Sequence, residues 1–582
     1  MKVLLLEFAV AFPGEQPRRP EEYLMGGNRD LVLNAASFFL GFKNRDSRYV
    51  NNRDLLGMFF RQENRDFATA VHERIRIQER QGRQVQIINP YTSLKLFETF
   101  FQIVDNDVTQ TPQEFEINLF KAYLVLNSNF TSRQMAATTS TTELEEELKI
   151  PMLFFCMSYV ASDVTNYDLS ELWITQTIKT IYLFQFLERD ARTQRLLAAF
   201  LTHFECRSWE EYLKRLLPLT APAIKSEREA HTDIILTGDE QYEAACTFIE
   251  KFIVPINEPL LESDFLSLRS KPLYKIEDGK YRIIFSLFVL EKIFKGMYFI
   301  LRDINTSLPA DEKITDLKSL FGADFAENTL CSEVIKIIYP DNCVRYSGEE
   351  LAAMGIQGAP DSYVRKAKNI LLIESKDFLI PAPVKESCDY SQYENEFEKK
   401  LYFMVDRRGV EMPKAIMQLI GTIRRVLRKE FEADKRYHYR DVTIYPVLLT
   451  HEHQYNVAGF NELLNYWFQA ELELLQEEGF YIRGVRPLVV VNIDSLIYHQ
   501  VALQKEIPLH EVLNKYLEHT HIAPGIMFPT EAEAQKHVMS KMDPFSIFIH
   551  NYFTDLGFRE FPPMLNELGL TIFKEERENS DQ

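Results

Sequence analysis

Two acidic residues and one lysine stand at a spacing that suits hydrolysis assisted by a metal ion. Asp361 opens one short segment, and a second segment, Asn369–Ile373, ends directly in Glu374, Ser375 and Lys376. Side chains alternate along a strand, so Glu374 and Lys376 point to one side, and a hairpin between the two segments would bring Asp361 to the same end. Two clustered carboxylates repel each other unless a cation lies between them, and hard oxygen ligands suit Mg²⁺ or Mn²⁺. The pattern therefore predicts a divalent metal site with a lysine beside it.

The lysine adds chemistry to such a site. An amine next to a bound metal ion can orient or deprotonate an attacking water and can stabilise charge on a phosphate. An acid-x-Lys triplet alone has little specificity, because it recurs at several other places, such as Asp311 and Lys313. The triplet at 374–376 differs because it follows an aliphatic run and has Pro360 and Asp361 one hairpin upstream. The alternative interpretation is an ordinary sheet edge whose terminal Glu and Lys form a solvated pair.

The order of the expected elements resembles that of the PD-(D/E)xK nuclease superfamily, which has a restriction-endonuclease-like fold, over residues about 320–500. Apolar spacing and turn signals predict, in chain order, a helix at 321–340, strands at 342–346, 362–366 and 369–376, a helix at 413–431 that begins with Pro413, a strand at 442–449, a helix at 460–477 and a strand at 487–491. The resemblance implies an α/β fold with a mixed sheet flanked by helices, and the helical patterns of residues 1–265 predict a large, mainly α-helical N-terminal region before it. The long segment between Lys376 and Pro413 departs from the family pattern.

The resemblance also implies a set of metal ligands. Mg²⁺ or Mn²⁺ would be held by Asp361, Glu374 and the carbonyl group of Ser375. Glu327, on the helix before the first strand, would act directly or through water, and Glu333 is the alternative on the same helix.

Two further catalytic residues follow from the resemblance. Lys376 would position the attacking hydroxide, and Gln418 matches the extra polar residue that the family places on the helix over the sheet. A solvent-facing glutamine is the alternative interpretation of Gln418, because the long insertion leaves its placement open. The implied activity is that of a Mg²⁺-dependent nuclease that hydrolyses phosphodiester bonds of nucleic acid, and we expect DNA rather than RNA.

The charge of the chain is uneven. The formal net charge is −19, whereas residues 399–440 contain twelve Lys and Arg against five Asp and Glu. Attraction to phosphate depends on local positive charge rather than on the total, so we expect this segment to contact nucleic acid next to the metal site. The expected contacts are Lys414, Arg424, Arg425, Arg428 and Lys429. A solvated helix face is the alternative.

The length of 582 residues exceeds the usual size of one domain. The expected divisions are a mainly helical domain of unknown role (1–265), a connector (266–319), the nuclease-like domain (320–506) and a helical extension with a flexible tail (507–582). No apolar run reaches the length of a membrane span. The six cysteines lack a CxxC pair, which favours a cytoplasmic protein without zinc.

The remaining features leave several functions open. His451 and His453 follow a predicted strand, but no third metal ligand is evident nearby, so loop histidines with hydrogen-bond partners are the simpler interpretation. The helical first half would recognise a protein partner, sense a signal or form a homodimer, and a sensing region joined to a nuclease suits a bacterial defence effector by analogy of fold. The alternatives to a nuclease are a catalytically inactive module of the same fold that binds nucleic acid or scaffolds a complex, and a helical interaction protein.

Overall fold

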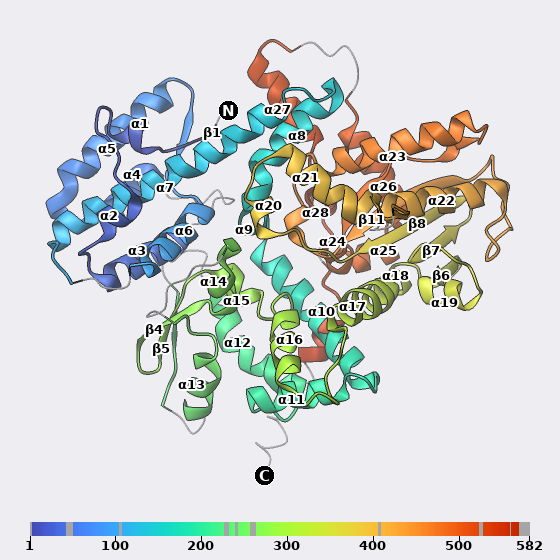
Figure 1. Cartoon of the computed structure of the whole chain (residues 1–582), viewed down its shortest axis with the longest axis horizontal. Coiled ribbons are helices and arrows are strands. Elements are labelled where there is room, and N and C mark those ends of the chain that lie inside the picture. The colour runs from blue at the N-terminus through green and yellow to red at the C-terminus, as the bar shows by residue number, and fades with distance from the viewer. Residues whose placement is uncertain are drawn as a thin grey trace. The chain divides into compact units, whose positions relative to one another are not determined.

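The protein is a mixed α/β structure with several small sheets and many helices, and Figure 1 shows it as a computed structural model. The structure describes residues 3–41, 51–103, 107–225, 232–238, 242–255, 263–405, 409–522, 528–558 and 560–569. The chain forms two compact units, which we describe separately. Unit 1 contains residues 1–135, 168–176 and 204–297, and unit 2 contains residues 136–167, 177–203 and 298–582.

Unit 1 is mainly helical. Its helices include α3 (Arg29–Gly41), α5 (Arg65–Arg80), α6 (Pro90–Phe101) and α12 (Trp209–Lys225). It also contains a parallel pair, β1 (Val3–Leu5) and β2 (Gln84–Gln86), and an antiparallel sheet in the order β3-β5-β4, formed by Asp233–Ile235, Lys280–Ile283 and Leu273–Glu277.

The sheet of unit 1 corrects the prediction that residues 266–319 are a connector. Tyr281 and Ile283 of β5 are buried, so this segment contributes to a core. The turn signals before β5 come from a tight hairpin turn, in which Gly279 has a φ of 73° that glycine adopts without strain, and not from a linker.

Unit 2 is built on a five-stranded mixed sheet with the strand order β12-β11-β8-β7-β6. The strands are β6 (Val344–Ser347), β7 (Ser362–Lys366), β8 (Asn369–Lys376), β11 (Thr443–Thr450) and β12 (Val489–Asn492). The first three form an antiparallel meander, whereas β11 runs parallel to β8 and β12 runs parallel to β11. Each strand lies within two residues of its predicted position, so the prediction of a mixed sheet is confirmed.

The centre of the sheet is β8. A tight turn joins it to β7, and Ala367 in that turn has a φ of 53°. The aliphatic residues of β8 are each 0% exposed: Ile370, Leu371, Leu372 and Ile373. A continuous apolar run of this kind is what a strand covered on both faces requires.

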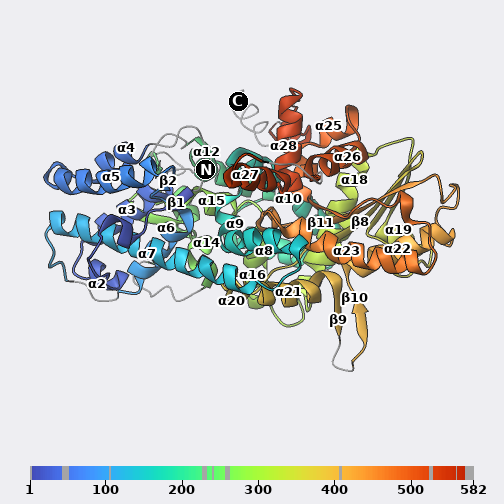
Figure 2. The ribbon, with the colours of Figure 1, turned by 90° about the horizontal axis from the view of Figure 1, so that it is seen from above.

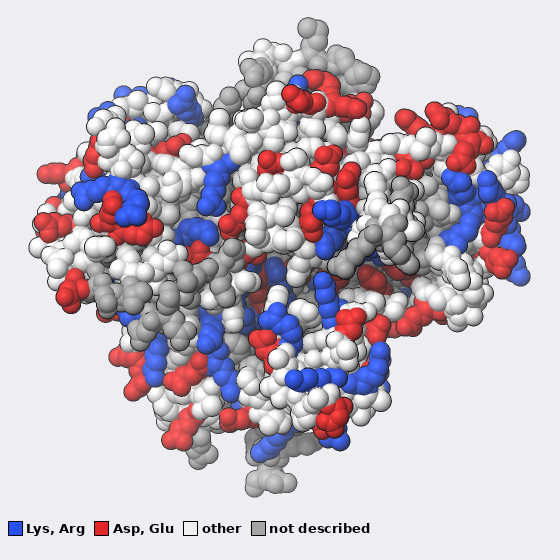
Figure 3. All heavy atoms as spheres, in the orientation of Figure 1, with Lys and Arg blue, Asp and Glu red and all other residues white. Residues whose placement is uncertain are grey.

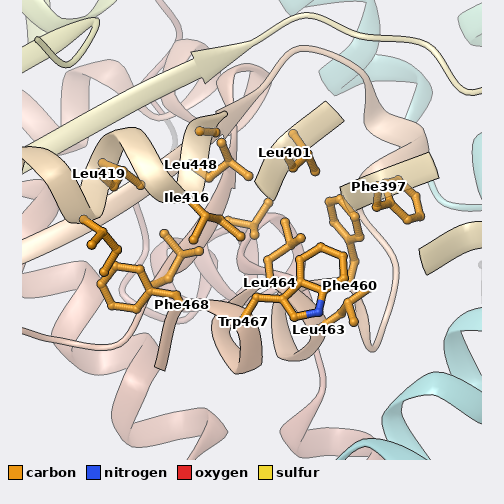
Figure 4. Close-up of a cluster of buried hydrophobic side chains, with 14 of the residues drawn as sticks. Phe397, Leu401, Ile416, Leu419, Leu448, Phe460, Leu463, Leu464, Trp467 and Phe468 are labelled. Carbon is orange, nitrogen blue, oxygen red and sulfur yellow. The ribbon is translucent and has the colours of Figure 1, made fainter. Parts of the chain in front are cut away.

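Helices α22 (Ala415–Arg428) and α23 (Phe460–Glu477) cover one face of this sheet. They share a core with Ile370 of β8, and Figure 4 shows their side chains, such as Ile416 and Leu464, meeting there. Apolar residues at helical spacing therefore predicted both helices, because these residues form the face that packs on the sheet.

The predicted start of α22 was wrong. Pro413 ends β10 (Glu411–Pro413), which pairs with β9 (Phe403–Val405) in a hairpin that projects from unit 2 in Figure 2. The proline therefore closes a strand, and Lys414 is the residue at the helix N-cap. The helix also ends early, because Lys429 adopts a left-handed conformation at its C-terminus.

The helix predicted at 321–340 has two parts. Its first part, η4 (Leu320–Cys331), has wide π-helical turns, and its second part is α18 (Ser332–Ile338). Glu327 lies in the π-helical part, and helical segments of this kind are frequent at functional sites.

Helix α8 (Glu146–Ser158) belongs to unit 2, although its residues were predicted to lie in the N-terminal domain. The ring of Phe155 lies 5.5 Å from that of Tyr393 and 5.9 Å from that of Phe460. These aromatic contacts bring the helix into the core of the sheet, and the predicted boundary near residue 265 is corrected accordingly.

A stretch that includes α8 also bears on membrane association. Glu146–Thr165 is long and apolar enough to cross a membrane by length and composition, and no second stretch of this kind occurs in the described ranges. However, 61% of its most apolar window is buried inside the protein, as in a core helix.

The predicted C-terminal extension is helical. It contains α26 (Leu509–Thr520), α27 (Glu531–Lys541) and α28 (Phe545–Asp555). Tyr516 of α26 and Phe548 of α28 pack with ring centres 5.4 Å apart. The tail predicted to be flexible, residues 574–582, lies outside the described residues.

Packing of α23 on the sheet can be tested with a matched pair of substitutions. Leu464 is fully buried, whereas Leu474 on the same helix is 51% exposed. We expect Leu464→Ala to lower the free energy of unfolding by about 2–5 kcal/mol, because it leaves a cavity in the core, and Leu474→Ala to change it by less than about 0.5 kcal/mol. Denaturant unfolding measures both values. Equal effects of the two substitutions would contradict this packing.

Candidate active site

The predicted acidic residues and the lysine meet at the carboxyl end of β8. Nζ of Lys376 lies 2.9 Å from Oε1 of Glu374, which is 1% exposed. Asp361 stands directly before β7, and its Oδ2 accepts a hydrogen bond of 2.7 Å from the backbone N–H of Ser375. The antiparallel register places Ser362 opposite Ile373, so the hairpin brings the two carboxylates together.

A third carboxylate reaches the same lysine from the helix before the sheet. Nζ of Lys376 lies 3.7 Å from Oδ2 of Asp361 and 3.9 Å from Oε1 of Glu327. Glu333, the alternative on this helix, instead pairs with Lys336 at 2.9 Å, and its side chain is 42% exposed. Three carboxylates from three separate segments therefore surround one ammonium group, and Glu327 is the helix residue that takes part.

The electrostatics of this group follow from burial and crowding. Burial and the neighbouring charge of Asp361 raise the pKa of Glu374 to about 8. Burial raises the pKa of Glu327 to about 7 against the opposing effect of Lys376, and burial likewise raises the pKa of Asp361. Burial lowers the pKa of Lys376, but attraction by the three acids outweighs it and holds that pKa above its usual value.

The donor set fits a hard divalent cation. When all four groups are ionised, two negative charges remain uncompensated. In addition, Oε2 of Glu374 is buried and accepts no hydrogen bond from the residues that the structure describes. A buried carboxylate oxygen without a partner is costly, and Mg²⁺ or Mn²⁺ would satisfy it together with Asp361. We therefore regard Glu374 and Asp361 as the residues that could hold the metal.

Gln418 is not brought into this group. It lies on α22, half-buried on the flank of the helix, and its backbone N–H donates to the carbonyl oxygen of Lys414. Within the described ranges its side chain makes no hydrogen bond, and its half-buried position differs from the solvent-facing glutamine of the alternative interpretation.

Two of the predicted nucleic-acid contacts are engaged within the protein. Arg424 forms an ion pair of 2.8 Å with Glu478. Arg425 donates to the carbonyl oxygens of Gln357, at 2.6 Å, and of Gly358. Their guanidinium donors therefore hold loops of unit 2 in place.

The other three predicted contacts are distributed over both ends of α22. Lys414 stands at its N-cap, whereas Arg428 and Lys429 are exposed at its C-terminal end. Arg428 lies over the ring of Phe480, 4.8 Å from its centre.

His451 is a neighbour of the site whose role the sequence did not predict. Its Nε2 lies 2.7 Å from Oγ of Ser375, and burial together with Lys179 and Lys376 lowers the pKa of His451 to about 3, so the ring is neutral. His453 instead bonds the carbonyl oxygen of Asp163, so the two histidines do not form a metal pair. The position of His451 in the sequence could have indicated this contact. It directly follows β11, which runs parallel to β8, so the two strands end on the same side of the sheet.

Behind His451 lies a buried ion pair. Lys179 donates to the carbonyl oxygen of His451 at 3.1 Å and pairs with Asp494 at 2.6 Å. Both charged side chains are less than one tenth exposed. The pair fixes the loop after β11, and through it the partner of Ser375.

The raised pKa of Glu374 predicts a specific pH dependence. Its value is about 8 in the folded protein and about 4.3 in an unfolded chain, so its contribution to stability is fully present below the unfolded value and is lost as the pH rises through the folded value. In buffer that contains a metal chelator, we expect the melting temperature to fall more between pH 6 and pH 9 for the wild type than for Glu374→Gln, because the glutamine side chain cannot ionise. Glu333→Gln is the control and should keep the wild-type dependence. The same pH dependence in Glu374→Gln would show that Glu374 titrates normally.

Comparison with known proteins gives no family for the chain. No family model, no curated protein and no solved structure matches it. The functional interpretation therefore depends on the geometry of the groups around Lys376.

Proposed function

We propose that the protein is a Mg²⁺-dependent nuclease with a restriction-endonuclease-like core in unit 2. One observation carries this proposal. Three carboxylates converge on Lys376 at the carboxyl end of the central strand β8: those of Glu327, Asp361 and Glu374. In addition, the buried Oε2 of Glu374 has no hydrogen-bond partner in the described part of the chain. Acidic oxygen ligands next to an amine are the groups that phosphodiester hydrolysis needs.

The order of elements in unit 2 supports the same fold. A helix precedes an antiparallel meander of three strands, α22 follows, and β11 then lies parallel to the last strand of the meander. This is the order that the sequence resemblance to PD-(D/E)xK nucleases implies.

The mechanism assigns separate roles to the four side chains. Asp361 and Glu374, with the carbonyl of Ser375, would hold Mg²⁺ or Mn²⁺, which polarises the phosphate and stabilises the leaving oxygen when bound. Lys376 would donate to the attacking water and to a non-bridging phosphate oxygen. Glu327, whose pKa is about 7, would accept the proton of the water, because a general base works best near the ambient pH.

The substrate and setting are part of the proposal. We propose DNA rather than RNA as the substrate and a cytoplasmic location, which the six free cysteines support. The helical N-terminal region would bind a protein partner or form a homodimer. By analogy of fold, the protein would act as a bacterial defence effector.

A specific feature also favours a second candidate function. The ammonium group of Lys376 lies 2.9 Å from Glu374 and within 4 Å of both other carboxylates, so it already offsets part of their charge. A lysine in this position suits a catalytically inactive module that binds nucleic acid or scaffolds a complex without a metal ion.

Cleavage of nucleic acid separates the two functions. With Mg²⁺ or Mn²⁺, we expect the wild type to cleave plasmid or linear DNA, and Glu374→Gln and Lys376→Met each to lose at least about 100-fold in rate, because each removes a group that acts on the transition state. Asp311→Asn and Lys313→Met form the matched control, since they alter an exposed acid-x-Lys triplet of the same unit. Melting curves establish that every variant is folded.

Two outcomes would contradict the proposal that the protein is a nuclease. Equal cleavage by the wild type and both site variants would indicate a contaminating enzyme. Absence of cleavage of DNA and RNA with either metal, in a protein that still binds nucleic acid, would favour the inactive module.

A further inference from the structure

The end of the unit 2 sheet that lies opposite the site carries a cluster of basic and aromatic residues. We call it the distal surface and define it by Arg428, Arg436, Tyr439, Arg440, Phe480 and Tyr481. Arg428, Arg436, Arg440 and Tyr481 are exposed, and the two other rings are half-buried. Figure 3 shows Lys and Arg side chains gathered at the edge of the molecule where α22 ends in Figure 1.

The position of the distal surface follows from the sheet register. Thr443, the first residue of β11, lies opposite Asn369, the first residue of β8, whereas Thr450 lies opposite Lys376. The distal surface adjoins the start of β11. Arg486, which follows Tyr481 by five residues, donates its backbone N–H to the carbonyl oxygen of Ile444 in β11. The eight-residue strand β8 separates the two ends by about 23 Å.

Aromatic rings position the arginines of this surface. Arg428 lies 4.8 Å from the ring centre of Phe480, and Arg440 lies 5.5 Å from that of Tyr439 and 5.9 Å from that of Tyr481. Nε of Arg440 also donates to the hydroxyl of Tyr439 at 3.0 Å. A cation over a ring face is held in place while most of its N–H donors stay available.

Among the described residues, no carboxylate accepts from the side chains of these arginines. Over the described ranges, Arg428, Arg436 and Arg440 form no ion pair, in contrast to Arg424 with Glu478. Such oriented guanidinium groups suit the bidentate recognition of phosphate. On a chain with a net charge of −19, a local basic surface is where a polyanion would approach.

We propose that the distal surface binds the phosphate backbone of the nucleic-acid substrate, at a distance from the site of hydrolysis. This inference rests on the proposed function for the identity of the polyanion. The inference adds that the substrate is a polymer long enough to reach both the distal surface and the site of hydrolysis. The separation of about 23 Å corresponds to about seven base pairs of duplex at 3.4 Å for each pair. A shorter oligonucleotide would reach only one of the two places at a time.

The test measures binding alone, in the Glu374→Gln background and in a chelator. Fluorescence anisotropy of a labelled 30-base-pair duplex is followed from 50 to 200 mM salt. We expect the added pair Arg428→Ala and Arg440→Ala to lower affinity at least tenfold at 50 mM salt and to reduce the slope of log affinity against log salt by about 1.8, since each phosphate contact contributes about 0.9.

Two controls make the result specific. Arg195→Ala removes an exposed arginine of α11 (Gln194–Phe204) and should leave the slope unchanged. Arg428→Lys with Arg440→Lys keeps both charges and should restore most of the slope, and melting curves establish that both double variants are folded.

The possible results separate this inference from the proposed function. An unchanged affinity and slope in the double alanine variant would overturn the inference, even if the wild type cleaves DNA. Absence of binding to the 30-base-pair duplex at 50 mM salt would overturn it as well. Loss of slope in a protein that never cleaves would support the inference while contradicting the nuclease.

Discussion

The buried contact between Lys376 and Glu374 is the interaction on which the rest of the candidate site depends. A glutamate that is 1% exposed at the end of a central strand is tolerated when it is protonated or when a cation lies beside it. Lys376 supplies that cation from the same face of β8, two residues later. The hairpin that positions Asp361 and the π-helical segment that positions Glu327 then add two more acids, so the fold gathers more negative charge than the lysine offsets.

This excess of charge is a cost to stability that packing must offset. Raised pKa values of Glu374 and Glu327 show that the folded protein disfavours their ionised forms. The apolar core of β8, α22 and α23 supplies the compensating free energy. A site that costs stability, and in which Oε2 of Glu374 has no hydrogen-bond partner among the described residues, is consistent with the proposed function.

Local patterns predicted the sheet and its hairpin, because strand alternation, the aliphatic run of β8 and the turn at Ala367 are properties of neighbouring residues. They also predicted that Asp361 and Glu374 meet, whereas Glu327 was expected from the resemblance to PD-(D/E)xK nucleases, with Glu333 as the alternative. They did not predict the contact between His451 and Ser375, which joins residues 76 positions apart, or the place of α8, whose Phe155 packs against Phe460. The basic residues of 399–440 were expected next to the metal site, but those that follow α22 lie at the far end of the sheet, because β11 begins there in parallel register with β8.

The most direct test of the account is calorimetric titration of the metal-free protein with Mn²⁺ at pH 8. We expect one site in the wild type, loss of that site in Asp361→Asn and Glu374→Gln, and binding at least as tight in Lys376→Met, because the competing ammonium group has been removed. Absence of binding in the wild type, or a site that survives in both acid variants, would contradict the claim that these carboxylates form a divalent metal site.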